Sequence, residues 1–259
     1  MSAGRLLRLV AVSWYLHLKM LHRSMFDSVM QVVWPLFFAT TALLVYRATG
    51  DRDALSYAAT GAAVVTVWSA VSSNASGILQ RERAFGTLEL LVAAPAPFSL
   101  SIMSIVLAVT TTGGYAVAAT LLWSRFVFGV HLAPAWPLPF ALALVATVCS
   151  FGVLGFLLAV AAVRYRAVFA LGGALELPLW LACGFLVPVA LLPSWLRPLS
   201  WLLPPTWGMQ AVRAAAAGQS LWADLGLWAG STAAYAAAAV WVAATVLRSA
   251  RRHATLSLT

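Results

Sequence analysis

Long apolar runs, each about the length of a membrane-spanning helix, constrain the fold of this chain more than any other feature. A transmembrane helix needs roughly 20 predominantly apolar residues. Six runs meet this requirement: residues 28–46, 55–78, 98–122, 136–163, 167–188 and 223–247. Only 9% of the 259 residues are charged, whereas soluble domains contain about 25%. The runs predict an all-α integral membrane protein with six transmembrane helices, organised as a single transmembrane domain over residues 1–259.

The loops between these runs differ in their basic residues, and this difference predicts an orientation. Because the number of spans is even, both termini lie on the same side of the membrane. Eleven of the 16 Lys and Arg residues fall on that side and five on the other. Cytoplasmic loops are enriched in Lys and Arg, so we expect a multi-pass protein of the cell (inner, cytoplasmic) membrane with both termini in the cytoplasm. Basic clusters between apolar runs also favour contact with membrane lipid over nucleic acid.

The first 27 residues have the pattern of an amphipathic helix. On a helical projection, five basic side chains fall within an arc of about 100°, and Leu, Val and Trp fill most of the remaining surface. These five are Arg5, Arg8, Lys19, His22 and Arg23. The pattern predicts a cytoplasmic interfacial helix over residues 1–27. Its basic face contacts lipid headgroups, or the helix packs on the protein's own cytoplasmic surface, and the two arrangements are compatible.

A charged hairpin, residues 80–97, separates the second and third runs. Four of its side chains are charged: Arg81, Glu82, Arg83 and Glu89. Gly86 is expected to end the preceding helix, and Thr87 to cap a short helix that begins at residue 88. The spacing leaves two interpretations open, a rigid charged finger in the cytoplasm or an ordinary solvated turn.

Two stretches of the chain resemble ABC-2 type transporter permeases. The hairpin sequence RERAFGTLELLVAAP is similar to the family's pattern between its second and third spans, except that Ala84 stands where the family usually has glutamate. The matching positions are Glu82, Arg83, Gly86, Thr87, Leu88, Glu89, Leu91 and Pro95. The second stretch matches at Gly184, Phe185, Pro188, Leu192, Pro193, Trp195, Leu196, Pro205 and Arg213. Together with the six spans and the N-terminal helix, the resemblance covers nearly the whole chain.

The resemblance implies specific partners. Such permeases pair with a second copy or a similar permease, here most simply a homodimer, and bind a cytoplasmic P-loop ATPase subunit. The hairpin would be the helix that couples to this ATPase, through Arg81, Glu82, Arg83, Gly86, Thr87 and Glu89. Residues 189–222 would form external helices that re-enter the outer leaflet before the last span.

The chain has no sequence pattern typical of an enzyme. A P-loop requires a lysine preceded by glycine, and Lys19, the only lysine, follows leucine. We therefore expect no catalytic residue, metal site or cofactor in this chain, with ATP and Mg²⁺ on the partner ATPase. The expected function is export of an amphipathic small molecule, such as a drug, antibiotic or lipid, and thus drug resistance. The alternatives are a polysaccharide or lipo-oligosaccharide permease and, in a different class, an ATP-independent membrane scaffold or enzyme.

Polar side chains in the spans suggest a substrate path. Ser69, Ser72, Ser73 and Ser76 recur at the spacing of one helix face. They are expected to line such a path or to hydrogen-bond between packed helices. Glu176 lies near the middle of the predicted fifth span, where an isolated charge is costly. Its expected partner is a cationic substrate, a proton shared with a neighbouring helix, or an arginine. Pro178 is expected to kink the helix beside it.

Overall fold

The described part of the chain consists of helices joined by short connections. The structure, a computed structural model, describes residues 3–23, 25–48, 50–84, 86, 98–131, 134–164 and 173–253. The long helices are α1 (Ala3–Leu21), α2 (Met25–Arg47), α3 (Arg52–Ala84), α5 (Phe98–Phe128), α6 (Pro137–Arg164) and α11 (Trp222–His253). The short ones are α8 (Glu176–Ala182), η1 (Val189–Leu191), α9 (Arg197–Leu202) and α10 (Pro204–Ala216). The described residues contain no strand, which confirms the predicted all-α class.

Five helices within the described residues are long and apolar enough to cross a membrane. Their membrane-compatible segments are Val29–Arg47, Asp53–Ser72, Ser99–Phe128, Pro137–Ala162 and Trp222–Thr245. Each overlaps one of the six predicted runs, and the chain is a multi-pass membrane protein, as predicted.

The predicted fifth span, residues 167–188, has a different structure in its described part. Residues 165–172 lie outside the described residues, so the total of six spans stays a prediction. Beyond them, residues 173 and 174 are helical, residue 175 lies in a turn, and α8 has only seven residues, Glu176–Ala182. The helix ends there because Gly184 has a φ of 71°, a left-handed conformation that glycine adopts without a steric penalty.

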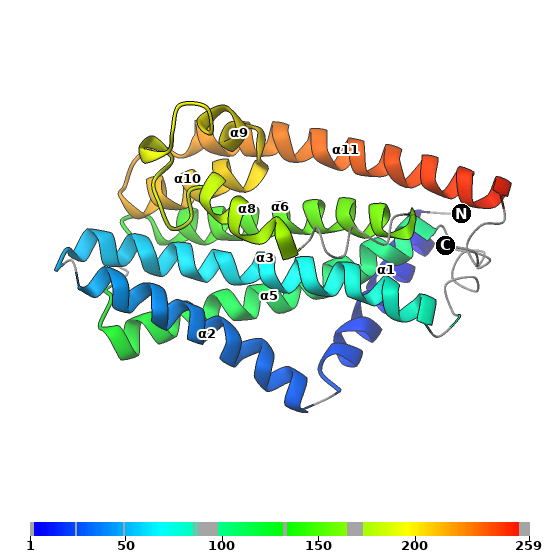
Figure 1. The fold of residues 1–259 in the computed structure, drawn as a ribbon, viewed down its shortest axis with the longest axis horizontal. Helices are drawn as coiled ribbons and strands as arrows, with labels where there is room; N and C mark the ends of the chain where they lie inside the picture. Colours follow the sequence, from blue (N-terminus) through cyan, green and yellow to red (C-terminus); the bar gives the residue numbers. More distant parts are fainter. Residues whose placement is uncertain are drawn as a thin grey trace.

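Helices α3, α5, α6 and α11 run along one axis with α3 in the middle, and α1 and α2 lie at an angle to them (Figure 1). Helix α3 packs against α2, α5 and α6, and α6 also packs against α10 and α11. Large buried side chains join these elements, among them Trp68 of α3, Phe151 of α6 and Phe185 after α8. Helix α1 begins, and α3 and α11 end, at one end of the molecule, which we call the termini end. Helices α8, α9 and α10 gather toward the opposite end, which we call the far end.

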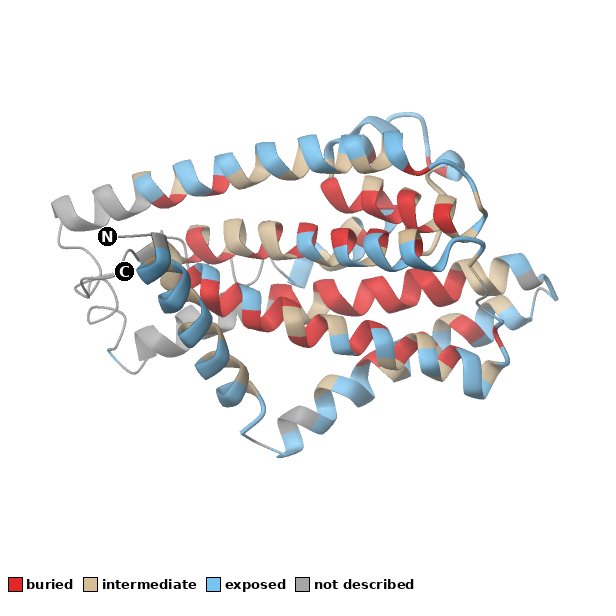
Figure 2. Ribbon diagram, turned by 180° about the vertical axis from the view of Figure 1, so that it is seen from behind, coloured by how far each residue is buried: buried red, intermediate tan, exposed pale blue. Residues whose placement is uncertain are grey.

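Helices α2 and α11 lie on opposite flanks and leave much of their apolar surface uncovered. Buried residues concentrate in α3, α6 and α10, whereas α2 and α11 are largely exposed (Figure 2). In water this exposure would oppose folding, but hydrocarbon is a suitable solvent for it. The flanking helices therefore present the surfaces that face lipid or another protein.

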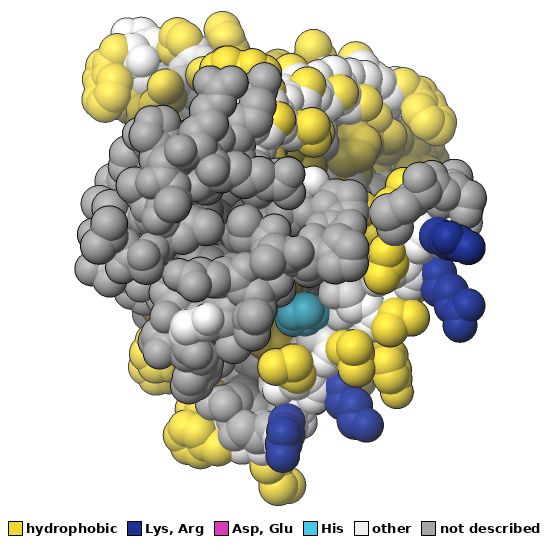
Figure 3. All heavy atoms as spheres, turned by 90° about the vertical axis from the view of Figure 1, so that its right-hand side faces the viewer, with side chains coloured by type: hydrophobic (Ala, Val, Ile, Leu, Met, Phe, Trp, Pro, Cys, Tyr) yellow, Lys and Arg dark blue, Asp and Glu magenta, His cyan; other side chains and the backbone are white. Residues whose placement is uncertain are grey.

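Helix α1 confirms the predicted N-terminal helix and shows how it is held. It packs against α5, and the indole Nε1 of Trp14 donates a hydrogen bond of 3.1 Å to Thr111 Oγ1. The rings of His22 and Tyr115 meet edge to face, with centroids 6.5 Å apart. The basic side chains Arg5, Arg8, Lys19 and Arg23 are exposed. Viewed onto the termini end, the Lys and Arg side chains that the picture colours lie on one side of the surface, with apolar side chains between them (Figure 3). One face thus binds the protein and another is free for headgroups.

Candidate functional site: polar contacts along α3

Helix α3 carries most of the side chains predicted to be functional. Its last turn contains residues 81–83, and the helix ends at Ala84. Gly86 is exposed and has a φ of 67°, so the chain turns at the residue expected to break the helix. The side chains of Arg81, Glu82 and Arg83, and all of Thr87 and Glu89, lie outside the described residues. The role of these six residues in coupling to an ATPase stays a prediction.

The middle of α3 meets the beginning of α8 through a serine and a carboxylate. Ser69 Oγ donates a hydrogen bond to Glu176 Oε1. Ser72 is buried, and its hydroxyl points back along α3 to the carbonyl of Ser69, at 3.4 Å. The side chains of Ser73 and Ser76 lie outside the described residues. The structure therefore brings together Ser69 and Glu176, two members of the predicted path that are far apart in sequence.

The chain is helical on both sides of a turn beside Glu176. Residues 173 and 174 are helical, Leu175 lies in a turn with right-handed helical backbone angles, and α8 begins at Glu176 with Pro178 as its third residue. A proline has no N–H group to bond a carbonyl of the preceding turn, and it interrupts or kinks a helix for that reason. Because residues 165–172 lie outside the described residues, the expected kink beside Glu176 stays a prediction. The carboxylate is half-buried and contacts a neighbouring helix, one of the arrangements that the sequence left open.

At the far end, side chains from three helices bind one turn. Arg213 of α10 donates from Nη2 to the carbonyl oxygens of Gly184 (2.6 Å) and Phe185 (3.2 Å). Its guanidinium carbon lies 3.6 Å from the ring centroid of Tyr57 on α3. Tyr57 donates to the Gly184 oxygen at 2.8 Å, and Tyr46 of α2 donates to the carbonyl of residue 186. We call this cluster, Tyr46, Tyr57, Arg213 and the turn 184–186, the far-end clamp.

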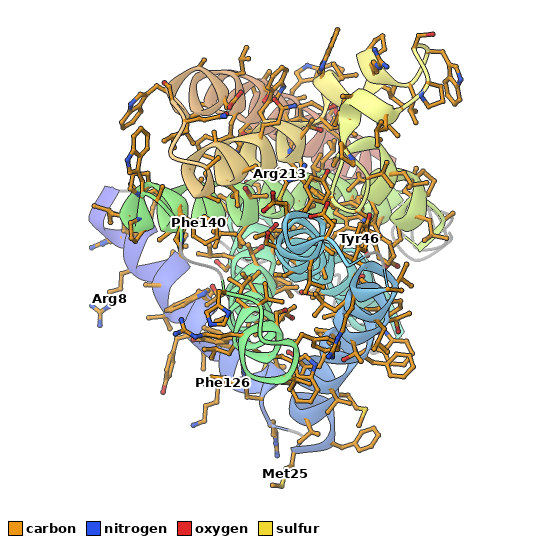
Figure 4. The ribbon with its side chains drawn as sticks, turned by 90° about the vertical axis from the view of Figure 1, so that its left-hand side faces the viewer. Arg8, Met25, Tyr46, Phe126, Phe140 and Arg213 are labelled. Carbon is orange, nitrogen blue, oxygen red and sulfur yellow. The ribbon has the colours of Figure 1, made fainter. Side chains whose placement is uncertain are left out.

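The clamp depends on close backbone approach and on a charged donor. Gly61 of α3 lies under the turn, where a Cβ atom would overlap the carbonyl oxygen of Phe185. Burial lowers the pKa of Arg213 to about 10, so its guanidinium stays charged near neutral pH. A charged donor on two carbonyls makes stronger hydrogen bonds than a neutral one. Figure 4, a view onto the far end, shows Arg213 and Tyr46 beside the end of α3.

Comparison with known proteins identifies the family. A family model described as ABC-2 type transporter matches residues 8–216, more than half of the chain. The chain belongs to the ABC-2 type transporter family. As a member, this ABC-2 subunit is a membrane component of an ABC transporter, and the family associates with an ABC ATPase. No curated protein matches the sequence.

The second stretch that resembles the family has a structural explanation in this ABC-2 subunit. Gly184, Phe185 and Arg213 belong to that stretch, and the structure joins them in the far-end clamp. The clamp tyrosines, Tyr46 and Tyr57, were not identified from the sequence. In the sequence, each of these tyrosines lies near the end of an apolar run. Tyrosines that anchor a span at the membrane interface occupy the same position, so the position alone does not reveal a role in the clamp.

Proposed function

We propose that this ABC-2 subunit is the permease of an exporter that moves an amphipathic small molecule, such as a drug, antibiotic or lipid, out of the cytoplasm or the inner leaflet. The family match over residues 8–216 carries this proposal. A separate P-loop ATPase binds ATP and Mg²⁺ and supplies the energy, and two copies of the subunit form the transport pathway in the cell membrane.

The shape of α3 supports a coupling role for residues 80–97. The helix extends continuously from the far-end clamp to Ala84, so the hairpin is attached directly to the helix whose membrane-compatible segment, Asp53–Ser72, is the most buried of the five. A flexible linker would absorb a displacement, whereas a helix transmits it. In this proposal the ATPase displaces the hairpin, and α3 carries the displacement to Ser69 and to the clamp.

The test of the function is ATP hydrolysis in the assembled complex. The subunit is co-expressed with a P-loop ATPase encoded beside it, purified with it and reconstituted in lipid. Co-purification and ATP hydrolysis stimulated by amphipathic compounds are the expected results. Stimulation by a lipid-linked polysaccharide alone would favour the polysaccharide permease instead. Absence of any associated ATPase would contradict the proposal and favour an ATP-independent scaffold or enzyme.

The test of the coupling role uses two matched glycines. Gly86 and Gly50 are both exposed and both have a positive φ, and a Cβ atom added to either one would meet no neighbouring atom within 4 Å. Substitution by alanine therefore strains both turns by a similar amount, about 1 kcal/mol. We expect Gly86→Ala to reduce substrate-stimulated ATP hydrolysis and Gly50→Ala to leave it unchanged. Equal stimulation in both variants would leave residues 80–97 as an ordinary solvated turn.

A further inference from the structure

We propose that Glu176 and Trp180 of α8, with Ser69 of α3, form a binding site for an aromatic organic cation, reached from the exposed face of α2 along a ladder of aromatic rings. This inference rests on the proposed export of amphipathic molecules and adds the charge and ring character of the substrate.

The carboxylate of Glu176 lacks a cationic partner among the described side chains. Its hydrogen bond comes from Ser69, a neutral donor. Two described arginines that follow Glu176 in the chain use their guanidinium groups on backbone carbonyls, Arg197 on residues 190 and 192 and Arg213 on Gly184 and Phe185. A half-buried carboxylate in a membrane-embedded bundle is stabilised by a cation, and a cationic ligand supplies one.

The next turn of α8 places an aromatic ring on the same side as Glu176. Trp180 follows it by four residues, the spacing at which side chains of a helix are neighbours. Trp180 is buried, and among the described residues its indole Nε1 has no hydrogen-bond partner. A carboxylate and an indole on consecutive turns provide the two contacts that an aromatic cation needs, charge pairing and a ring face.

Three aromatic side chains of α2 continue from Trp180 to the molecular surface. The ring of Phe38 lies 5.9 Å from that of Trp180, edge to face, and the ring of Trp34 lies 5.5 Å from that of Phe38. Phe37 stacks on Trp34 at 6.3 Å. These distances are typical of interacting aromatic pairs.

Exposure rises steadily along this ladder. The exposed fraction is 6% for Trp180, 37% for Phe38, 58% for Trp34 and 65% for Phe37. The outer rings lie on the apolar face of α2 that the fold leaves uncovered. A cation that carries an aromatic ring can first bind the exposed rings of α2. It can then move from one ring to the next until it reaches Trp180, where Glu176 is its neighbour on the preceding turn. A purely aliphatic cation gains the charge pairing without the ring contacts.

Tetraphenylphosphonium is a suitable probe, because tetraphenylborate has nearly the same shape and the opposite charge. Binding is measured by equilibrium dialysis on the purified full chain in lipid nanodiscs, without an ATPase, so the result is independent of ATP-driven transport. Each ion is measured alone, and we expect saturable binding of the phosphonium, weaker binding of the aliphatic tetrabutylphosphonium, and no saturable binding of the borate. Absence of saturable phosphonium binding, or equal saturable binding of the borate, would overturn the site but leave the ATP hydrolysis test of export unaffected.

The variants assign the contacts. Glu176→Gln is expected to weaken phosphonium binding about tenfold, whereas Glu176→Asp, which keeps the charge, retains most of it. Trp180→Leu is expected to weaken it several-fold and Trp180→Phe, which keeps a ring, much less. Asp224→Asn and Trp241→Leu, on α11, serve as controls with unchanged affinity. Equal affinity in the wild type and Glu176→Gln, with both proteins folded by size-exclusion chromatography, would refute the assignment.

Discussion

At the scale of single residues, Arg213 is the side chain on which the far-end clamp depends. Its planar guanidinium spans two carbonyls and covers the Tyr57 ring, which a lysine ammonium cannot do at once. We expect Arg213→Lys to lower the free energy of unfolding by about 2 kcal/mol. Cys183 is buried next to the turn, so the rate at which its thiol is labelled reports how often this region opens. In a Cys149→Ser background, Arg213→Lys should raise that rate. Arg197→Lys, on an exposed arginine that also binds carbonyls, should leave the labelling rate nearly unchanged.

The glycine beneath the clamp gives a second prediction at this scale. A Cβ at Gly61 would overlap the Phe185 carbonyl oxygen, and backbone on both sides prevents an easy adjustment. We expect Gly61→Ala to destabilise the fold by about 2 kcal/mol or more, seen as a lower thermal unfolding midpoint in detergent. Gly114→Ala on α5, where nothing lies within 4 Å of the added Cβ, is the control. A midpoint unchanged in both variants would mean that the turn does not approach α3 this closely.

At the scale of elements, α1 combines a packed face with a basic one. Because Trp14 fixes the helix to α5, the exposed Arg5, Arg8 and Lys19 are held in place rather than free to follow lipid. Each basic residue near an anionic surface contributes about 1 kcal/mol. We expect replacing all three by Gln to remove most of the stabilisation that phosphatidylglycerol adds over phosphatidylcholine nanodiscs, measured by thermal unfolding. Undiminished stabilisation by the anionic lipid would place its binding site elsewhere.

The membrane-spanning helices can be predicted from sequence, whereas the break after α8 and the contacts between helices cannot. The helices α2, α3, α5, α6 and α11 follow from run length, because hydrocarbon thickness sets the length of a span. The break after Ala182 does not follow, since hydropathy is unaffected by the positive φ of Gly184. Pairs such as Ser69 with Glu176 depend on how helices pack, and composition carries no signal for packing over that sequence separation.

At the scale of the whole molecule, the orientation in the membrane is testable with two cysteines. The structure places Ala84 at the termini end and exposed Ser220 on the connection between α10 and α11, toward the far end. In a background lacking Cys149 and Cys183, an impermeant thiol reagent applied to sealed, right-side-out cells should label Ser220→Cys but not Ala84→Cys. This outcome follows from the bias of basic residues toward the termini side. The reverse labelling would invert the orientation.

The unbroken length of α3 gives the molecule a lever. Its 33 residues span about 50 Å, well beyond the hydrocarbon core of about 30 Å. Ser69 stands near the middle, about 18 Å from Tyr57 and about 22 Å from Ala84 along the axis. If the helix tilts by about 5° around Ser69, both of its ends move by about 2 Å in opposite directions. Two ångströms is enough to break a hydrogen bond, so a small push beside Gly86 would unlatch the turn that Tyr57 and Arg213 hold at the other end.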